Sequence, residues 1–387
     1  MNYRRIPRVN FDVSEIGLGC EHLEKKDKAL VDEVVKTALD GDVNILDVFM
    51  PQPEVRSLIG DAIRSVRKDI HLQGHIGAVL ENGQYKRSRD VDKCDEYIRD
   101  FMTRFHTDYI DIGMIHYVDS LDDWRTIETQ GVLEYALQLK EKGVIRAIGL
   151  SSHKPLTALT AVQSGHIDVL MFSINPSFDL LPEQTEIEAL FDRKTYEQGA
   201  LDGTNPVRQQ LYAECARRGV GITVMKTLSA GQLLFAEASP FGAPLTVAQC
   251  EHYVLSRPGV VSALIGCVSG DEVRQALKYS TLSDEDKDYA AVLSASERTG
   301  VRYAPTGNCM YCNHCLPCPQ EIDIAAVHKY YDLATNLSEI PATIREHYLT
   351  LHAHASDCIE CGDCEENCPF GVNVTANMAK AATLFGL

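Results

Sequence analysis

Two runs of closely spaced cysteines carry the clearest chemistry in this sequence. Eight of the thirteen cysteines in the 387 residues lie after position 308. The second run is Cys358-x₂-Cys361-x₂-Cys364-x₃-Cys368-Pro369. This is the spacing with which cysteine thiolates bind a four-iron–four-sulfur cluster. The first run is Cys309-x₂-Cys312-x₂-Cys315-x₂-Cys318-Pro319. Its spacing is the same except that one residue fewer precedes the fourth cysteine. Zinc sites more often combine two C-x-x-C pairs across a longer loop, so both runs favour iron and sulfur.

The ligand assignment follows from the way two-cluster ferredoxins are built. In these proteins the fourth cysteine of one run binds the cluster of the other run. The sequence therefore predicts two 4Fe-4S clusters. The first would be bound by Cys309, Cys312, Cys315 and Cys368. The second would be bound by Cys358, Cys361, Cys364 and Cys318.

The five other cysteines have a different interpretation. Cys94, Cys215 and Cys250 lie on apolar faces of expected helices and are interpreted as core residues. Cys20 and Cys267 lie at the ends of expected strands, where contact with a ligand is more frequent.

The elements before the cysteine runs alternate between short apolar strands and amphipathic helices. Eight strands are expected, at residues 13–19, 44–49, 70–77, 109–116, 145–152, 167–175, 221–228 and 262–267. Eight strand–helix units over about 270 residues predict a (β/α)₈ TIM barrel. A doubly wound sheet is the alternative, but no G-x-G-x-x-G follows any expected strand. We expect residues 1–295 to form the barrel and residues 296–387 a small, largely helical ferredoxin-like domain.

Chemistry in such a barrel takes place at the carboxyl ends of its strands. The residues expected there are Cys20, Asp47, His75, His116, Ser151, Asn175, Lys226 and Gly266. His75 next to Asp47 suggests an acid pair in which the carboxylate keeps the imidazole protonated. His116, Tyr117 and His153 are further candidates. The alternatives are that these histidines are only hydrogen-bonded residues of the barrel rim, or that His75 and His116 bind a metal ion.

The barrel segments are similar to those of the aldo-keto reductases. The matching pieces include Ile16-Gly17-Leu18-Gly19, Asn44-Ile45-Leu46-Asp47, Leu58-Ile59-Gly60 and Ile148-Gly149-Leu150-Ser151-Ser152-His153. Some members of that family carry a C-terminal ferredoxin module, and the stretch from Cys315 to Ile324 looks like theirs.

The resemblance implies a carbonyl reductase that uses NADPH and a tetrad of Asp, Tyr, Lys and His. Asp47 matches the aspartate of the family and His116 matches its histidine. Gln52 stands where the proton-donating tyrosine is expected, and His75 stands where the lysine is expected. A glutamine amide cannot deliver a proton at neutral pH as a phenol can, so the ordinary mechanism is in doubt.

The cofactor positions implied by the resemblance also depart from the family pattern. The family asparagine is replaced by Ser152 and the family glutamine by Met171. The tyrosine that stacks on the nicotinamide is replaced by Lys226, and a basic residue is replaced by Val268. The residues expected to line a cofactor, either NADP(H) or a flavin, are Ser151, Ser152, Asn175, Lys226, Gly266 and Ser269.

Composition limits the partners. The net charge is −18, which disfavours nucleic acid and anionic membranes. No apolar run is long enough to span a bilayer, and no targeting segment is recognised, so we expect a cytoplasmic protein.

Three functions remain open. The favoured one is an oxidoreductase of anaerobic type, whose clusters pass electrons from a donor such as a ferredoxin to a small organic substrate or bound cofactor in the barrel. The second is an NADPH-dependent carbonyl reductase with accessory clusters. The third is a non-catalytic electron-transfer or redox-sensing subunit.

Overall fold

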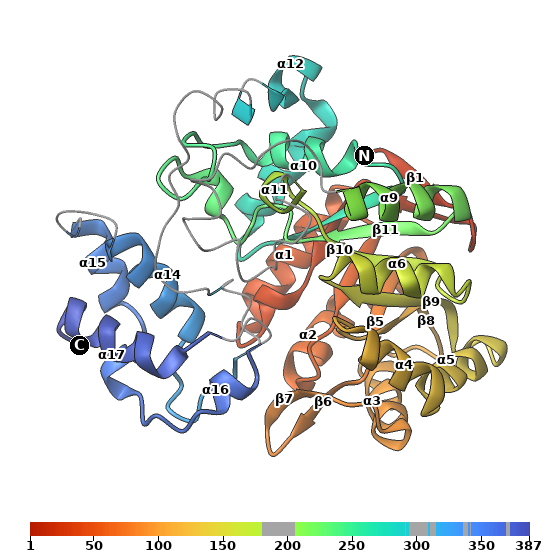
Figure 1. Ribbon diagram of the computed structural model, residues 1–387, viewed down its shortest axis with the longest axis horizontal. Helices are drawn as coiled ribbons and strands as arrows, with labels where there is room; N and C mark the ends of the chain where they lie inside the picture. Colours follow the sequence, from red (N-terminus) through yellow and green to blue (C-terminus); the bar gives the residue numbers. More distant parts are fainter. Residues whose placement is uncertain are drawn as a thin grey trace.

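A closed barrel of eight parallel strands forms the larger part of the molecule (Figure 1). The computed structural model describes residues 1–179, 206–290, 292–293, 309, 315–335, 340, 342–368 and 372–387. The barrel strands are β3 (Ile16–Gly19), β4 (Ile45–Val48), β5 (His71–Ile76), β8 (Ile110–Ile115), β9 (Ile145–Ser152), β10 (Val169–Ser173), β11 (Gly221–Met225) and β12 (Val260–Gly266). Strand β12 pairs with β3 and closes the barrel, so the predicted (β/α)₈ fold is confirmed.

Helices connect successive strands on the outside of the barrel. Their bounds are α1 (Lys28–Asp40), α2 (Pro53–Ile63), α3 (Val91–Arg104), α4 (Leu121–Thr129), α5 (Val132–Glu141), α6 (Pro155–Gln163), α7 (Pro176–Asp179), α9 (Pro206–Arg218), α10 (Val247–Leu255), α11 (Gly270–Leu277) and α12 (Asp284–Lys287). Short 3₁₀ helices are η1 (Glu21–Leu23), η2 (Arg67–Asp69), η4 (Gln232–Leu234) and η5 (Lys278–Thr281). Side-chain caps define several starts, such as Asp90 for α3 and Thr246 for α10. A capping box of Ser283 and Asp286 begins α12.

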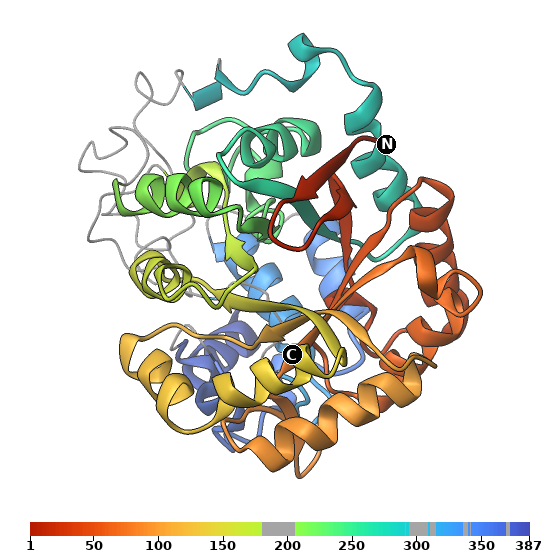
Figure 2. The same cartoon turned by 90° about the vertical axis from the view of Figure 1, so that its right-hand side faces the viewer.

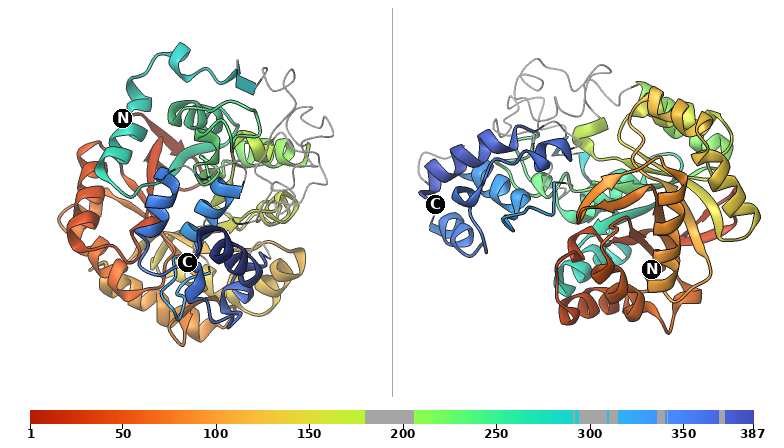
Figure 3. Two further views of the ribbon diagram at one scale, coloured as in Figure 1. Left: turned by 90° about the vertical axis from the view of Figure 1, so that its left-hand side faces the viewer. Right: turned by 90° about the horizontal axis from the view of Figure 1, so that it is seen from below.

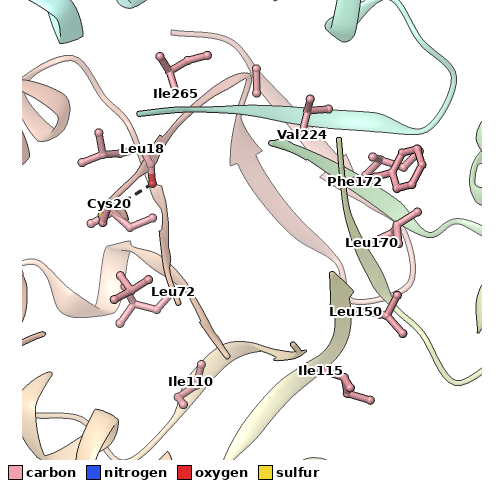
Figure 4. Close-up of a cluster of buried hydrophobic side chains, with 14 of the residues drawn as sticks. Leu18, Cys20, Leu72, Ile110, Ile115, Leu150, Leu170, Phe172, Val224 and Ile265 are labelled. Carbon is pink, nitrogen blue, oxygen red and sulfur yellow. Dashed lines mark hydrogen bonds between the residues drawn. The ribbon is translucent and has the colours of Figure 1, made fainter. Parts of the chain in front are cut away.

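Strand alternation divides the barrel residues into two sets. Large apolar side chains such as Leu72, Leu170 and Phe172 radiate outward from the ring of strands and pack under the helices (Figure 4). Their neighbours along the strands belong to the inner set, which is apolar near the amino ends of the strands and includes Ile45, Ile112 and Val169. The inner positions nearer the carboxyl ends carry polar groups, so the chemistry is confined to one end of the barrel.

A two-stranded hairpin closes the opposite end. It consists of β1 (Tyr3–Ile6) and β2 (Phe11–Ser14) and lies across the end of the barrel (Figure 2). Its Ile6 and Val13 pack against the inner set of barrel residues. The expected first strand, 13–19, is therefore wrong at its start. Val13 and Ser14 belong to β2 and pair with β1, and the barrel strand begins at Ile16.

A second hairpin follows β5 and was not predicted. Its strands are β6 (Ala78–Glu81) and β7 (Gln84–Arg87), which pair antiparallel. Asn82 and Gly83 form the turn with φ of 52° and 78°, the left-handed conformations that a two-residue type I′ turn requires. The hairpin rises from the carboxyl end of β5, at the barrel mouth.

The described residues from 309 onward form a helical unit, here called the cysteine module. Its elements are α14 (Ile324–Thr335), α15 (Ala342–Leu349), η6 (Ala355–Asp357), α16 (Asp363–Glu366) and α17 (Val374–Phe385). Tyr348 and Phe385 stack at its centre with ring centroids 3.9 Å apart. None of the described helices is long and apolar enough to cross a bilayer.

The cysteine module lies over the barrel mouth, on the side opposite the β1–β2 hairpin (Figure 3). Phe178, which follows β10, is part of the apolar core of the cysteine module. Asn367 of the module donates a hydrogen bond to Gln84 of the β6–β7 hairpin at 3.5 Å. The module is therefore in contact with the elements that surround the mouth.

Candidate functional site

Three of the predicted strand-end residues form one buried hydrogen-bonded group. His75 Nε2 lies 3.0 Å from Asp47 Oδ1, and His75 Nδ1 lies 2.7 Å from His116 Nδ1. The three side chains are only 2–3% exposed. They come from the carboxyl ends of the neighbouring strands β4, β5 and β8, so the barrel pairing itself brings them together.

Tyr85 extends this group, and sequence reasoning missed it. The Tyr85 hydroxyl is hydrogen-bonded to His116 Nε2, the other ring nitrogen of that histidine. Tyr85 comes from β7 and is 7% exposed. Asp47, His75, His116 and Tyr85 are here called the buried quartet. The signal that could have found Tyr85 is the Asn82-Gly83 pair between two short strand-like stretches, which is typical of a hairpin.

Aromatic and polar neighbours hold the quartet in place. Phe49 stacks on the His116 ring with centroids 5.5 Å apart and an interplanar angle of 11°. Gln73, fully buried inside the barrel, donates a hydrogen bond to Asp47 Oδ1 at 2.9 Å. The β6–β7 hairpin is fixed from α3, where the Tyr97 hydroxyl donates to the Leu80 carbonyl at 3.0 Å. These contacts reduce the freedom of all four side chains before any substrate binds.

Gln52 does not join the quartet. It is the N-cap residue of α2, without a side-chain cap, and its Oε1 is buried without a hydrogen-bond partner among the described residues. The amide at this position therefore leaves an acceptor that a ligand hydroxyl or a water molecule can satisfy.

His153 and Tyr117 belong to a second polar group at the mouth. His153 Nδ1 lies 2.9 Å from Asp119 Oδ2, and the Ser152 hydroxyl donates to Asp119 Oδ1 at 3.2 Å. Burial would raise the pKa of Asp119, but His153 and Ser152 outweigh this and hold the pKa of the carboxyl below its usual value. The Tyr117 ring lies 5.2 Å from the His153 ring. The Tyr117 ring also lies 6.2 Å from the His116 ring, so this second group adjoins the quartet without sharing a hydrogen bond with it among the contacts described.

The residues expected to line a nicotinamide cofactor are engaged with the protein itself. The Ser151 hydroxyl accepts from the Tyr117 amide at 2.7 Å. Asn175 donates to the Lys226 carbonyl at 3.0 Å and accepts from the Phe178 amide at 3.0 Å. The His22 ring lies so close over Gly266 that a Cβ there would approach it to 2.4 Å.

The start of α11, where the resemblance places the 2′-phosphate, is occupied by acidic side chains. Ser269 caps the helix by accepting from the Glu272 amide at 3.3 Å. The Gly270 amide donates to Glu33 at 3.0 Å, and the Val268 amide donates to Glu272 at 2.8 Å. Carboxylates at these amides would repel a phosphate. The Val268 and Gly270 amides are therefore already used by carboxylates, while the Arg274 guanidinium also lies beside Gly270.

The five cysteines outside the two runs are buried. Burial and the neighbouring Asp47 and Cys267 raise the pKa of Cys20 well above its usual value. Burial also raises the pKa of Cys267 to about 12. Cys94, Cys215 and Cys250 are fully buried and pack in apolar clusters. None of these thiols is placed as an ionised nucleophile at neutral pH.

The cysteine module brings residues of both runs together. One pocket is lined by Cys315 and Cys318 of the first run and by Cys358, Cys361 and Cys364 of the second. Four of these five thiols are the ones assigned above to one cluster, and Cys315 is assigned to the other, so the pocket brings thiols of both runs together. Cys309, Cys315 and Cys368 belong to the same apolar cluster of the module or pack against it, and Cys312 lies outside the described residues. No three His, Cys, Asp or Glu side chains of the described residues are arranged to hold a single metal ion.

Comparison with known proteins gives two matches along the sequence. Residues 15–296 match the model of the aldo/keto reductase family, and residues 308–373 match that of a 4Fe-4S dicluster domain. The uncharacterized oxidoreductase YqkF of Bacillus subtilis (strain 168) is 31% identical over 192 residues, which cover 48% of this chain and 59% of that protein. The chain spans under two thirds of the length of the curated relatives it matches, 59% and 57%.

Solved structures share the fold at lower identity. The holo form of an aldo-keto reductase from Bacillus halodurans matches with a TM-score of 0.59 at 20% identity, over 79% of this chain and 99% of that one. An aldo/keto reductase from Klebsiella pneumoniae in complex with NADP and acetate matches with a TM-score of 0.50 at 17% identity, over 75% and 93%.

Proposed function

Because this chain belongs to the aldo/keto reductase family and carries a C-terminal 4Fe-4S dicluster domain, we propose that it reduces a small organic substrate at the barrel mouth with electrons delivered through the cysteine module. The electrons would come from a one-electron carrier such as a reduced ferredoxin. The substrate would be a carbonyl compound or an alkene activated by a carbonyl group.

The observation that carries this proposal is the buried quartet beneath the cysteine module. Reduction of a carbonyl needs a proton at the oxygen as well as electrons. His75 is hydrogen-bonded to Asp47, and we take His75 as the origin of that proton within the quartet. The clusters, when bound, would supply electrons one at a time. The β6–β7 hairpin links the two parts, because Gln84 contacts the cysteine module and the next residue, Tyr85, contacts His116.

An NADPH-dependent carbonyl reductase is the alternative, since a family relative has been crystallised with NADP. The carboxylates of Glu33 and Glu272 at the start of α11 argue against it here. The two functions differ in the electron donor that they require, so a donor comparison separates them.

The test is turnover of the anaerobically purified protein with NADPH or with a reduced viologen, across a panel of aldehydes, ketones and activated alkenes. We expect turnover with the viologen and slow or no turnover with NADPH. Efficient NADPH-driven reduction that survives removal of the clusters would refute the proposal.

Two histidine variants test the proton source within the same assay. His75→Ala should lower viologen-driven turnover by about 10²-fold or more, the usual contribution of a general acid. His106→Ala is the control, because the His106 side chain lies on the outer surface and pairs there with Asp61. If His75→Ala has no more effect than this control, the electron route can stand but His75 is not the proton source.

A further inference from the structure

The hydrogen bonds of the buried quartet can be assigned in two ways that differ by one proton. With Asp47 ionised and both histidines neutral, His75 Nε2 donates to Asp47, so His75 Nδ1 accepts from His116 Nδ1. His116 Nε2 then has no hydrogen and accepts from the Tyr85 hydroxyl. Every hydrogen in this arrangement points toward Asp47.

One additional proton on His75 reverses the direction of two hydrogen bonds, the one between His75 and His116 and the one between His116 and Tyr85. The His75 imidazolium donates from both ring nitrogens, so His116 Nδ1 becomes an acceptor. His116 must then carry its hydrogen on Nε2 and donate to the Tyr85 oxygen. The hydroxyl hydrogen of Tyr85 is released from His116 and can point to another acceptor.

From this geometry we propose that Tyr85 is the residue that gives the proton to the substrate oxygen, and that His75 acts only through His116 and Tyr85. Both ring nitrogens of His116 are engaged inside the quartet, and His75 is only 2% exposed. The Tyr85 hydroxyl is the end of the quartet farthest from Asp47. A phenol brought in by the β6–β7 hairpin thus supplies the group that is missing at Gln52. This inference rests on the proposed function, because it assigns a step in that reduction.

The step balances in protons and electrons. A carbonyl group needs two electrons and two protons to become an alcohol, and two clusters held by the cysteine module would supply the two electrons when bound and reduced. Tyr85 gives its hydroxyl proton to the carbonyl oxygen and takes a proton from His116 Nε2, while His116 Nδ1 takes a proton from His75 Nδ1. His75 returns to the neutral form, with Nε2 still donating to Asp47, and water supplies the second proton to the carbon.

The first test compares Tyr85→Phe with Tyr109→Phe in the loaded protein, using the reduced viologen and the best substrate of the panel. Tyr85→Phe removes only the hydroxyl and should lower kcat by about 10²- to 10⁴-fold with a much smaller change in KM. It should leave the iron content and the bleaching of the clusters by dithionite unchanged. Tyr109 lies at the opposite end of the barrel, where Arg67 and Arg146 stack on its ring, so its phenylalanine variant should behave as wild type.

The second test needs no turnover. In protein labelled with 3-fluorotyrosine, the ¹⁹F resonance assigned to Tyr85 should shift at constant pH when His75 is replaced by Gln, whereas that of Tyr109 should not. An unchanged Tyr85 resonance would overturn the proposal even if the wild type reduced no substrate. Wild-type turnover with an unaffected kcat in Tyr85→Phe would also overturn it, while leaving the proposed function intact.

Discussion

Glu251 is a buried acid that the fold leaves without a partner. Its side chain on α10 is fully buried, and neither carboxyl oxygen has a hydrogen-bond partner among the described residues. Burial raises the pKa of Glu251 well above its usual value, so the folded protein holds this group as a neutral acid. In the unfolded chain the same group ionises near its ordinary pKa.

Stability should therefore fall as the pH rises above that ordinary pKa, because the folded state binds a proton that the unfolded state releases. The loss approaches about 1.4 kcal/mol per pH unit until the raised pKa of the folded state is reached. Glu251→Gln removes this titration, so it should match the wild type near pH 4 and exceed it increasingly toward neutrality. Anaerobic denaturant unfolding of both proteins across that range measures the difference, and parallel stability curves would contradict this account.

Whether a site residue could be predicted from the sequence depended on whether it lies at the end of a barrel strand. Asp47, His75 and His116 could be predicted as neighbours because each ends a strand, and strand ends meet at one rim. Their hydrogen bonds could not be predicted, because ring orientation depends on packing against residues such as Phe49. Tyr85 was missed because it belongs to a loop insertion outside the strand–helix pattern.

The β6–β7 hairpin is the element that carries Tyr85, and its turn offers a specific test. Gly83 has φ of 78°, and a Cβ added there would meet nothing within 4 Å. Gly83→Ala should therefore cost about 1 kcal/mol through backbone strain alone. Because this strain acts on the hairpin, it should also lower substrate turnover.

Gly143 provides a matched control for this change. It has φ of 72° with equally open surroundings, and it precedes β9 at the end of the barrel away from the mouth. Both alanine variants should lose similar unfolding free energy, whereas only Gly83→Ala should reduce turnover. Equal turnover in the two variants would show that the hairpin has no part in the reaction.

The eight barrel strands were predictable because apolar stretches recur with helical segments between them. The two hairpins were not, for different physical reasons. The residues of β2 run directly into β3 and looked like one strand, although Glu15 separates them. Hairpin β6–β7 is short and half exposed, so it has little of the buried apolar pattern that marks a barrel strand.

At the scale of the whole molecule, the cysteine module joins segments that are far apart in the sequence. Cys318 and Cys315 line the same pocket as Cys358, Cys361 and Cys364, and Cys318 is the one of the two whose charge acts on Cys364. Cys318→Ala should therefore damage the cluster of the second run and spare the cluster of the first, which electron paramagnetic resonance of the reduced protein can distinguish. Cys250→Ala, which changes a fully buried thiol of the barrel, should preserve both signals. Loss of the first-run cluster alone would show that the ligands do not cross between the runs.

The β1–β2 hairpin closes the amino end of the barrel, and this has a consequence for the rate of turnover. Ile6 and Val13 pack into the amino end of the barrel, and the cysteine module lies over the other end. Within the described residues the hairpin closes one end of the barrel, so in the proposed reduction substrate and product would both exchange at the other end. A product that lingers there blocks the next molecule of substrate, and the rate of its departure sets an upper limit on turnover.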